Sequence, residues 1–270
     1  MKRTLIIPAL ILAGVCAVWG CGSKNKTDLT SAHTTAAAET MAPSQTEPSE
    51  EESVPEVTAA DESSESEGSS SFSGVTVDTY SSNNISIEYP SVSDSLSSNA
   101  SAVNELLKNN ALSVISAYGI DEASDSLSVD CKIISANKQR LTAVYTGELS
   151  VSGGAHPTAV YYTNTVDLEA VSDIGLSTYA DPYTMAGYVM SDDCQFQGLT
   201  AEQEQAVKEY KAEQSVSAYQ KIFQNADFPL KGDSFPESFS YEVRGEIYLS
   251  IPVPHALGDY AIVVFTPETK

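Results

Sequence analysis

The most restrictive feature of this 270-residue sequence is a change of composition near residue 75. Residues 24 to about 74 contain almost no aliphatic or aromatic side chains and consist mainly of Ser, Thr, Ala, Glu and Pro. Such a segment buries too little apolar surface to offset the entropy that is lost on ordering. We therefore predict a disordered acidic stalk over residues 21–74 and one folded domain over residues 75–270.

The charge of the chain is strongly negative in both of these parts. The chain has 37 acidic and 14 basic residues, and residues 75–270 alone contain 26 acidic and 10 basic residues, a net charge of −16. Because nucleic-acid binding requires positive charge opposite the phosphates, this balance argues against a nucleic-acid partner. It favours a cationic partner, although negative charge also keeps an exported protein soluble.

The first 23 residues have the organisation of an export signal. Lys2 and Arg3 precede an apolar run over residues 5–19, and small residues follow it. The run is shorter than the about 20 apolar residues that a transmembrane helix needs, and it contains a proline. Residues 18–21 (Val-Trp-Gly-Cys) resemble the lipobox of bacterial lipoproteins, in which the cysteine is lipidated and becomes the mature N-terminus.

These features predict a signal peptide over residues 1–20 and lipid attachment at Cys21. Cys16 is a competing attachment site, and an ordinary secretory signal is the alternative to lipidation. A diacylglycerol group, together with a further acyl chain, meets the two-signal requirement for stable anchoring. We expect an exported protein whose N-terminal lipid holds it on the outer face of the bacterial cell membrane.

Within the domain, strand and helix patterns are mixed. Apolar residues on one face predict a helix over residues 100–118, and a capping box of Thr200 and Gln203 predicts a second helix over residues 200–226. The predicted class is α+β, an antiparallel sheet with two main helices packed on it. The glycine-rich residues 152–158 are expected to form a loop between two antiparallel strands. Alternating apolar residues predict strands at 85–89 with a stop at Pro90, and at 127–133, 141–151, 160–168, 241–251 and 260–265.

The chain carries no sequence motif for catalysis, a cofactor or a metal. It lacks the His-Glu-x-x-His and paired Cys-x-x-Cys spacings of zinc sites, the Gly-x-Ser-x-Gly turn of hydrolases and a phosphate-binding glycine loop. We therefore expect no catalytic residue, no cofactor and no metal ligand. His156 and His255 are interpreted as turn residues, since a site combining them with Asp259 would require two distant loops to converge.

The cysteines and tyrosines of the domain leave alternatives open. Cys131 and Cys194 can form a disulfide that closes about 64 residues and contributes roughly 4 kcal/mol, or they can remain buried thiols. Tyr161 and Tyr162 follow the loop that contains His156. These two tyrosines, with His156 and His255, are candidates for a ligand-facing surface, and packing in a half-buried sheet is the alternative.

The glycine-rich hairpin resembles that of a known family. Residues 141–168, with the loop Gly-Gly-Ala-His at 153–156, are similar to the extracytoplasmic domain of RsiV-type anti-sigma factors and to the N-terminal domain of PdaC-type peptidoglycan deacetylases. In that family a strand and a helix precede the hairpin, as residues 85–118 do here. A strand pair with an irregular, glycine-containing connection closes the family domain, and residues 251–264 are similar to it.

The resemblance implies a binding module. RsiV-type proteins add a cytoplasmic sigma-binding region and a transmembrane helix, and PdaC-type enzymes add a deacetylase domain; we expect neither activity from these 270 residues. In the anti-sigma relatives the shared domain recognises lysozyme, which is a basic protein. We therefore expect recognition of a basic protein such as lysozyme, or of a peptidoglycan component. A passive envelope lipoprotein without a discrete ligand and a cell-wall glycan hydrolase remain as alternatives.

Overall fold

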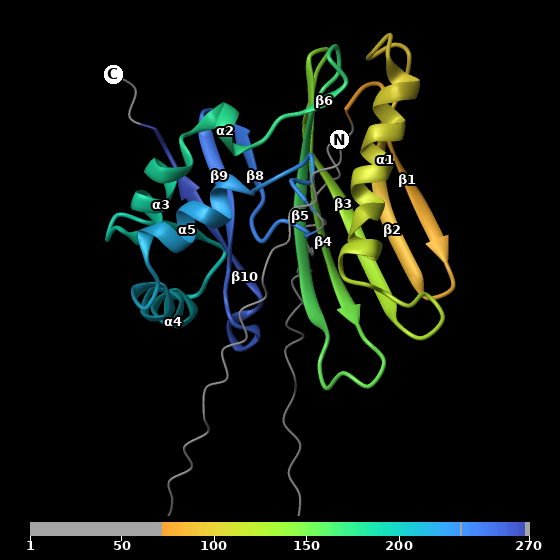
Figure 1. The fold of residues 1–270 in the computed structure, drawn as a ribbon. Coiled ribbons are helices and arrows are strands. Elements are labelled where there is room, and N and C mark those ends of the chain that lie inside the picture. Colours follow the sequence, from red (N-terminus) through yellow and green to blue (C-terminus); the bar gives the residue numbers. More distant parts are fainter. Residues whose placement is uncertain (1–71, 233, 268–270) are drawn as a thin grey trace, which may run out of the picture. The chain divides into compact units, whose positions relative to one another are not determined.

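The structure, a computed structural model, describes residues 72–232 and 234–267 as helices packed on two β-sheets (Figure 1). The α+β class is confirmed, with the strands divided between two sheets. The predicted signal peptide, the lipidation site at Cys21 and all but the last three residues of the predicted stalk lie outside the described residues. None of the helices in this described part has the length and apolarity to cross a membrane.

The first sheet contains six strands in their order along the chain. All neighbouring strands are antiparallel except β2 and β3, which run parallel and are connected by helix α1 (Ala100–Ala117). A parallel pair needs such a crossover. The six strands are β1 (Val75–Ser82), β2 (Ile85–Val92), β3 (Ser126–Ala136), β4 (Arg140–Ser150), β5 (Thr158–Asp167) and β6 (Ser172–Asp173).

The strand register places the beginning of β1 far from the β4–β5 loop. Val75 pairs with Val92 at one end of the sheet. The opposite end of β2 starts at Ile85, which lies level with Leu127 of β3, and Leu127 pairs with Leu149 of β4. The described chain therefore enters the first sheet at one end, and the β4–β5 loop lies at the other.

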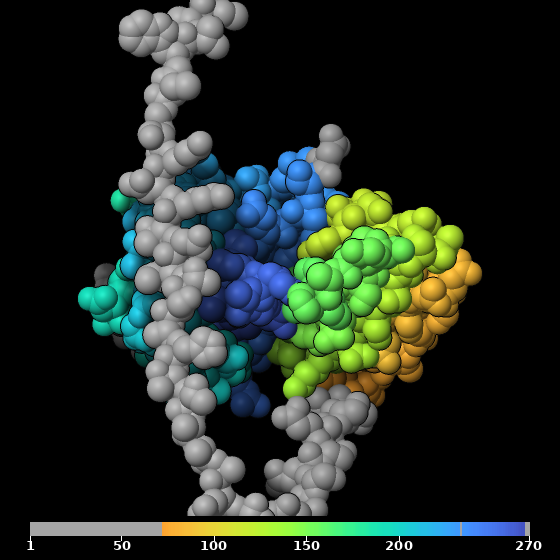
Figure 2. All heavy atoms as spheres, turned by 90° about the horizontal axis from the view of Figure 1, so that it is seen from below, coloured from red at the N-terminus to blue at the C-terminus, as the bar shows by residue number. Residues whose placement is uncertain are grey.

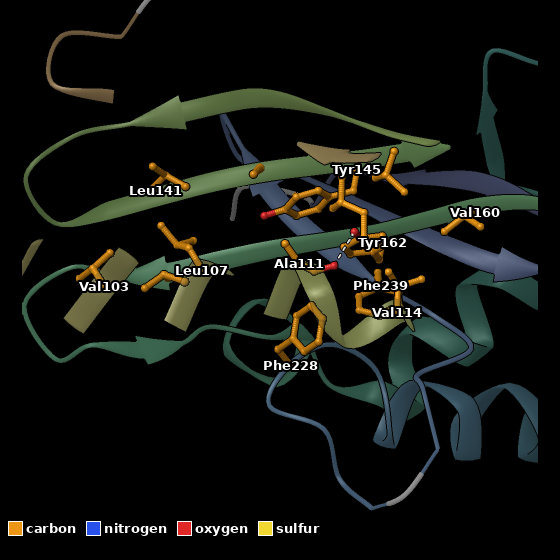
Figure 3. Close-up of a cluster of buried hydrophobic side chains, with 14 of the residues drawn as sticks. Val103, Leu107, Ala111, Val114, Leu141, Tyr145, Val160, Tyr162, Phe228 and Phe239 are labelled. Carbon is orange, nitrogen blue, oxygen red and sulfur yellow. Dashed lines mark hydrogen bonds between the residues drawn. The ribbon is translucent and has the colours of Figure 1, made fainter. Parts of the chain in front are cut away.

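Helix α1 lies with its apolar face on the first sheet (Figure 3). Val103, Leu107, Ala111 and Val114 are completely buried, as their spacing of three and four residues predicts. The hydroxyl of Tyr162 on β5 donates a hydrogen bond of 2.9 Å to the carbonyl oxygen of Ala111. This contact fixes the helix against the middle of the sheet.

Strand β2 continues to Val92, so the stop predicted at Pro90 is wrong. β2 is paired with β3 only from Ile85 to Ile87, and beyond this point only β1 pairs with it. A strand that is paired on one side tolerates a residue without a backbone N–H. Where the β2–β3 ladder ends, the carboxylate of Glu88 accepts a hydrogen bond of 3.0 Å from the backbone N–H of Cys131.

The second sheet has four antiparallel strands in the order β7-β10-β9-β8. Helices α2 to α5 lie beside it (Figure 1) and share a second apolar core with it. The strands are β7 (Gln195–Gln197), β8 (Ser240–Val243), β9 (Glu246–Pro252) and β10 (Tyr260–Phe265), and the helices are α2 (Leu176–Tyr179), α3 (Pro182–Met190), α4 (Ala201–Ala212) and α5 (Val216–Gln224).

The single helix predicted over residues 200–226 is in fact two helices. The capping box of Thr200 and Gln203 begins α4 as expected. A new helix begins at Ser215, whose side chain accepts a hydrogen bond of 3.2 Å from the N–H of Ala218. Serine in this position competes with helix continuation by satisfying the first N–H groups of the next helix.

Side chains connect the two sheets where β5 approaches β8. The hydroxyl of Thr163 donates a hydrogen bond of 2.7 Å to the carbonyl oxygen of Ser240. Phe228 and Phe239, which lie in the segments flanking the second sheet, belong to the first core (Figure 3). At this point of the junction, the two cores are joined by a polar side-chain contact and by these two aromatic rings.

Asp227 is a buried carboxylate at this junction. It accepts hydrogen bonds from the N–H of Leu176 at 2.7 Å, from the hydroxyl of Ser240 at 2.6 Å and from the N–H of Ser240. Its backbone is left-handed, with φ of 63°. Burial raises the pKa of Asp227 to about 6, although the hydrogen bonds from Ser240 and Leu176 act in the opposite direction.

Replacement of Asp227 by Asn should lower the free energy of unfolding by roughly 2–5 kcal/mol at neutral pH, because an amide NH₂ then faces backbone donors. The wild-type advantage should also depend on pH. The folded pKa of about 6 exceeds the ordinary value of 3.8, so the folded state binds the proton more tightly. This proton-linked part adds to the difference at neutral pH; it is complete below about pH 4 and is lost as the pH rises through about 6, so the wild-type advantage should be larger at pH 4 than at pH 8.

Urea unfolding of the wild type and Asp227→Asn between about pH 4 and pH 8 measures both effects. The exposed Asp94 provides the matched control, and Asp94→Asn should change stability by less than about 0.5 kcal/mol. A difference between wild type and Asp227→Asn that is the same at every pH would contradict the assigned pKa.

Candidate functional site

The β4–β5 loop (residues 151–157) and the β9–β10 connection (residues 253–259) meet at the same end of the two sheets. Figure 2 shows the green atoms of the first region beside the blue atoms of the second. The N–H of Ala159 at the start of β5 donates a hydrogen bond of 2.7 Å to Oδ2 of Asp259. This part of β5 lies beyond its short pairing with β6 at Val166 and Asp167, so a side chain satisfies the strand edge.

A tight backbone turn positions Asp259 for this contact. The connection contains one turn of 3₁₀ helix, η1 (His255–Leu257), in which the N–H of Leu257 donates to the carbonyl of Pro254 at 2.7 Å. Gly258 and Asp259 follow in left-handed conformations, with φ of 99° and 69°. A residue with a side chain is strained at φ of 99°, which explains the glycine. The turn brings Asp259 back beside His255.

His255 and Asp259 form a hydrogen-bonded pair. Nδ1 of His255 lies 2.9 Å from Oδ1 and 3.1 Å from Oδ2 of Asp259. An ionised carboxylate only accepts hydrogen bonds, so Nδ1 is the donor in this pair and Nε2 is the ring nitrogen that faces away from Asp259. The His255 side chain is 52% exposed and that of Asp259 is 17% exposed. Asp259 therefore orients a solvent-accessible imidazole.

His156 reaches the same place from the β4–β5 loop. The ring centroids of His156 and His255 are 6.2 Å apart, with an angle of 25° between the ring planes. The structure thus brings together the three residues His156, His255 and Asp259, for which the sequence required converging loops. Within residues 72–232 and 234–267, no cluster of three or more His, Cys, Asp or Glu residues has the geometry to hold a metal ion.

Asp125 fixes the start of the β4–β5 loop. Its Oδ1 accepts a hydrogen bond of 2.8 Å from the N–H of Ser152, and its Oδ2 accepts one of 2.9 Å from the N–H of Asp121. These two backbone hydrogen bonds lower the pKa of Asp125. The rest of the loop, including His156, is exposed. The loop is therefore anchored at its base and accessible at its tip.

A cleft of about 470 Å³ opens beside the two loops, with lining residues from both sheets. Four of its thirteen described lining residues are aromatic. The rings of Tyr161 and Tyr260 stack with centroids 4.7 Å apart. Tyr118, at the end of α1, meets Phe235 edge-on at 5.8 Å. The cleft therefore offers aromatic faces and edges to a ligand.

The charged residues in the lining of this cleft are both acidic. They are Glu237 and Asp259, and none of the described lining residues is basic. Burial, and then the charge of Asp259, raises the pKa of Tyr118, and burial raises that of Tyr260. The phenols therefore stay neutral at physiological pH and remain able to donate and accept hydrogen bonds.

Of the two tyrosines proposed from the sequence, only Tyr161 lines the cleft. Tyr162 is completely buried in the first core, where its ring stacks on that of Tyr145 with centroids 4.4 Å apart. Its assignment to a ligand-facing surface is wrong. Neighbouring residues of a strand point to opposite faces, so these two tyrosines cannot share one surface.

Cys131 and Cys194 are free thiols, so the disulfide that the sequence allowed is not formed. Cys131 packs against the first core and Cys194 belongs to the second. Burial raises the pKa of Cys131 to about 12 and that of Cys194 to about 11. Both thiols are therefore protonated at neutral pH.

No sequence pattern pointed to four of the residues that line the cleft. Tyr118 ends a helix, Phe235 and Glu237 lie in the connection before β8, and Tyr260 begins the last strand. They become neighbours only through the packing of the two sheets.

Comparison with known proteins gave similarity to solved structures alone. No family model matches the sequence, and no curated protein matches it. Among solved structures, the chain is similar to a DUF3298 family protein from Pseudomonas aeruginosa PAO1. The sequence identity is 9%, the match covers 72% of this chain and 97% of that chain, and the TM-score is 0.40.

Replacement of Asp125 by Ala should loosen the β4–β5 loop, because the N–H of Ser152 loses its acceptor. We expect faster amide hydrogen exchange at Ser152 and Gly154 and a lower urea midpoint above about pH 4. The hydrogen bonds lower the pKa of Asp125 in the folded state, so the carboxylate contributes to the free energy of unfolding only while it is ionised. This contribution is lost as the pH falls through the folded pKa, and acid should therefore remove the difference from wild type. The exposed Asp130 on β3 is the control, and equal exchange in Asp125→Ala and Asp130→Ala would refute the anchoring role.

Proposed function

We propose that this chain is a lipid-anchored extracytoplasmic binding module, whose cleft accepts a positively charged side chain of a basic partner protein. The observation that carries the proposal is the lining of the cleft, which combines aromatic rings with carboxylates and contains no basic residue among its described members. Aromatic faces and carboxylates together suit a lysine or arginine side chain.

The energetics favour a cation at this position. A cation over a tyrosine face gains about 0.5–2 kcal/mol, and most where it is partly desolvated. Tyr118 is 45% exposed at the cleft, so a partner side chain can reach it. Glu237 is exposed at the same place and supplies a negative charge. A partner's lysine or arginine can therefore contact an aromatic ring and a carboxylate together.

The charge of the whole domain acts in the same direction. A net charge of −16 over residues 75–270 attracts basic proteins and accelerates their association. The hairpin resembles that of the RsiV-type domain, which recognises lysozyme in the anti-sigma factors. This resemblance supports a basic protein as the partner. We therefore choose a basic protein over an anionic wall polymer.

The hydrogen bonds of Asp259 define its role in the site. Both carboxylate oxygens of Asp259 are already engaged, by Nδ1 of His255 and by the N–H of Ala159. A general acid or base needs a carboxyl group that is free to exchange a proton with the substrate. We assign Asp259 a positioning role on this basis.

Lipid anchoring is tested by Cys21→Ala in a bacterial host. Removal of the acylated thiol should move the protein from the membrane fraction to the soluble fraction, because the acyl chains supply the membrane affinity. Cys16→Ala is the matched control and should leave the protein in the membrane fraction. A Cys21→Ala protein that still resists release from membranes would overturn the assignment.

Partner recognition is tested by binding of the full chain, purified in detergent, to hen egg-white lysozyme at physiological salt. Cytochrome c, an unrelated basic protein, is the control for binding by charge alone. We expect a dissociation constant in the micromolar range or tighter for lysozyme, weaker binding of cytochrome c, and persistence at moderate salt. Glu237→Gln and Tyr118→Leu should each weaken lysozyme binding by roughly 2- to 30-fold.

Two variants outside the cleft serve as matched controls. Glu105 is exposed on α1 and Tyr183 is 60% exposed on α3, so Glu105→Gln and Tyr183→Leu should bind like the wild type. Equal binding of lysozyme and cytochrome c, or unchanged binding by the cleft variants, would count against the proposal. Cosedimentation with peptidoglycan sacculi but not with lysozyme would assign the cleft to a wall glycan.

A further inference from the structure

We propose that His156 and His255 together bind one divalent transition-metal ion of the zinc or copper class at the tip of the two converging loops. The ligands are Nε2 of His255 and one ring nitrogen of His156. Water, or a group from a bound partner, completes the coordination. This inference goes beyond the proposed function, because binding of the ion requires no partner protein.

The first support is the orientation of His255. Asp259 accepts a hydrogen bond from the Nδ1–H of His255, so the lone pair on Nε2 is directed away from the carboxylate. A histidine that ligates a metal commonly donates its other ring N–H to a carboxylate in this way, and the carboxylate increases the basicity of the ligand nitrogen. Asp259 is itself held by the N–H of Ala159, so the ring is oriented before any ion binds.

The second support is the distance between the two rings. Metal–nitrogen distances of about 2.0–2.1 Å and a tetrahedral angle place the centroids of two bound imidazoles about 5 Å apart. The centroids of His156 and His255 are 6.2 Å apart. Closure of the two loops by about 1 Å brings the ring centroids to the spacing of two imidazoles that share one ion.

The third support is the local freedom of the His156 loop. Residues 152–157 are exposed, and two glycines precede the Ala155–His156 dipeptide. Gly153 has a left-handed φ of 82°, and a Cβ there would meet no other atom. Asp125 holds the base of the loop while the tip is unobstructed. The tip can therefore close toward His255 without disturbing either core.

The ligand chemistry selects the class of ion. Imidazole nitrogens suit zinc, copper and nickel, whereas calcium and magnesium require oxygen ligands. Asp259 acts as the orienting group and not as a ligand, because its oxygens already accept hydrogen bonds from His255 and Ala159. The negative charge of the domain raises the local concentration of any divalent cation. Two protein ligands leave coordination positions open at the protein surface.

The test is titration of the full chain with Cu²⁺ and Zn²⁺, followed by calorimetry for both ions and by electron paramagnetic resonance for Cu²⁺. We expect one ion per chain, and a copper spectrum with coupling to two imidazole nitrogens. His156→Gln and His255→Gln should each weaken binding at least tenfold and lose one nitrogen from the spectrum. Asp259→Asn should weaken binding 10- to 100-fold while both nitrogens remain.

His33, the remaining histidine of the chain, provides the matched control, and His33→Gln should bind the ions like the wild type. His156 is exposed on a loop, so His156→Gln should unfold in urea like the wild type and its result reports on the site alone. A wild-type chain that binds neither ion would overturn the proposal. So would unchanged affinity in both His156→Gln and His255→Gln, or loss of binding in His33→Gln.

Discussion

The buried carboxylate of Asp227 is the interaction on which the arrangement of the two sheets depends. It accepts hydrogen bonds from Leu176 at the start of α2 and from Ser240 at the start of β8, and the carbonyl of Ser240 in turn accepts the hydroxyl of Thr163 on β5. Phe228 and Phe239, which directly follow Asp227 and directly precede Ser240, fill the first core. One charged group therefore holds together the segments that join both cores, and its removal would leave several buried donors unsatisfied.

The cleft follows from the way in which the sheets are joined. Side chains make the contacts between β5 and the second sheet. The side chain of Thr163 makes one in the middle of β5, and the side chain of Asp259 makes the other at the beginning of β5. Side-chain contacts hold two strand edges farther apart than a backbone ladder does, because a ladder spaces strands by about 4.8 Å. The tyrosines of β5 and β10 line part of the resulting space. The contacts that hold the two sheets together thus also leave the cleft between them.

Much of the local structure was predictable from the sequence, whereas the site was predictable only in part. The apolar spacing of α1, the capping box at Thr200 and the hairpin around residues 152–158 are short-range patterns, and the structure contains all three. The break at Ser215 depended on local competition between a capping serine and helix continuation, and the passage of β2 through Pro90 depended on pairing with β1 alone; apolar periodicity reveals neither. These differences left the α+β class unchanged.

Long-range packing explains what the sequence did not reveal about the site. His156 and His255 were selected as loop residues, but their contact depends on two strand pairs that end at the same level. Tyr161 and Tyr162 were assigned together, although the pleat of β5 directs one to the cleft and the other to the core. Helix α1 covers the face of β5 that carries Tyr162, and the position of the second sheet decides what lies beside the opposite face, at Thr163. That position depends on Asp227, whose role has no signature in the sequence.

The placement of β1 determines which way the site faces. Val75 lies at one end of the first sheet and the histidine pair lies at the other, and the eight residues of β2 between these ends span about 25 Å. Any force on the chain before Val75 therefore pulls on the side remote from the histidines. In a protein attached through Cys21, the length of the folded domain would therefore add to the reach of the tether, and the histidines would stand at the end of the first sheet opposite the attachment.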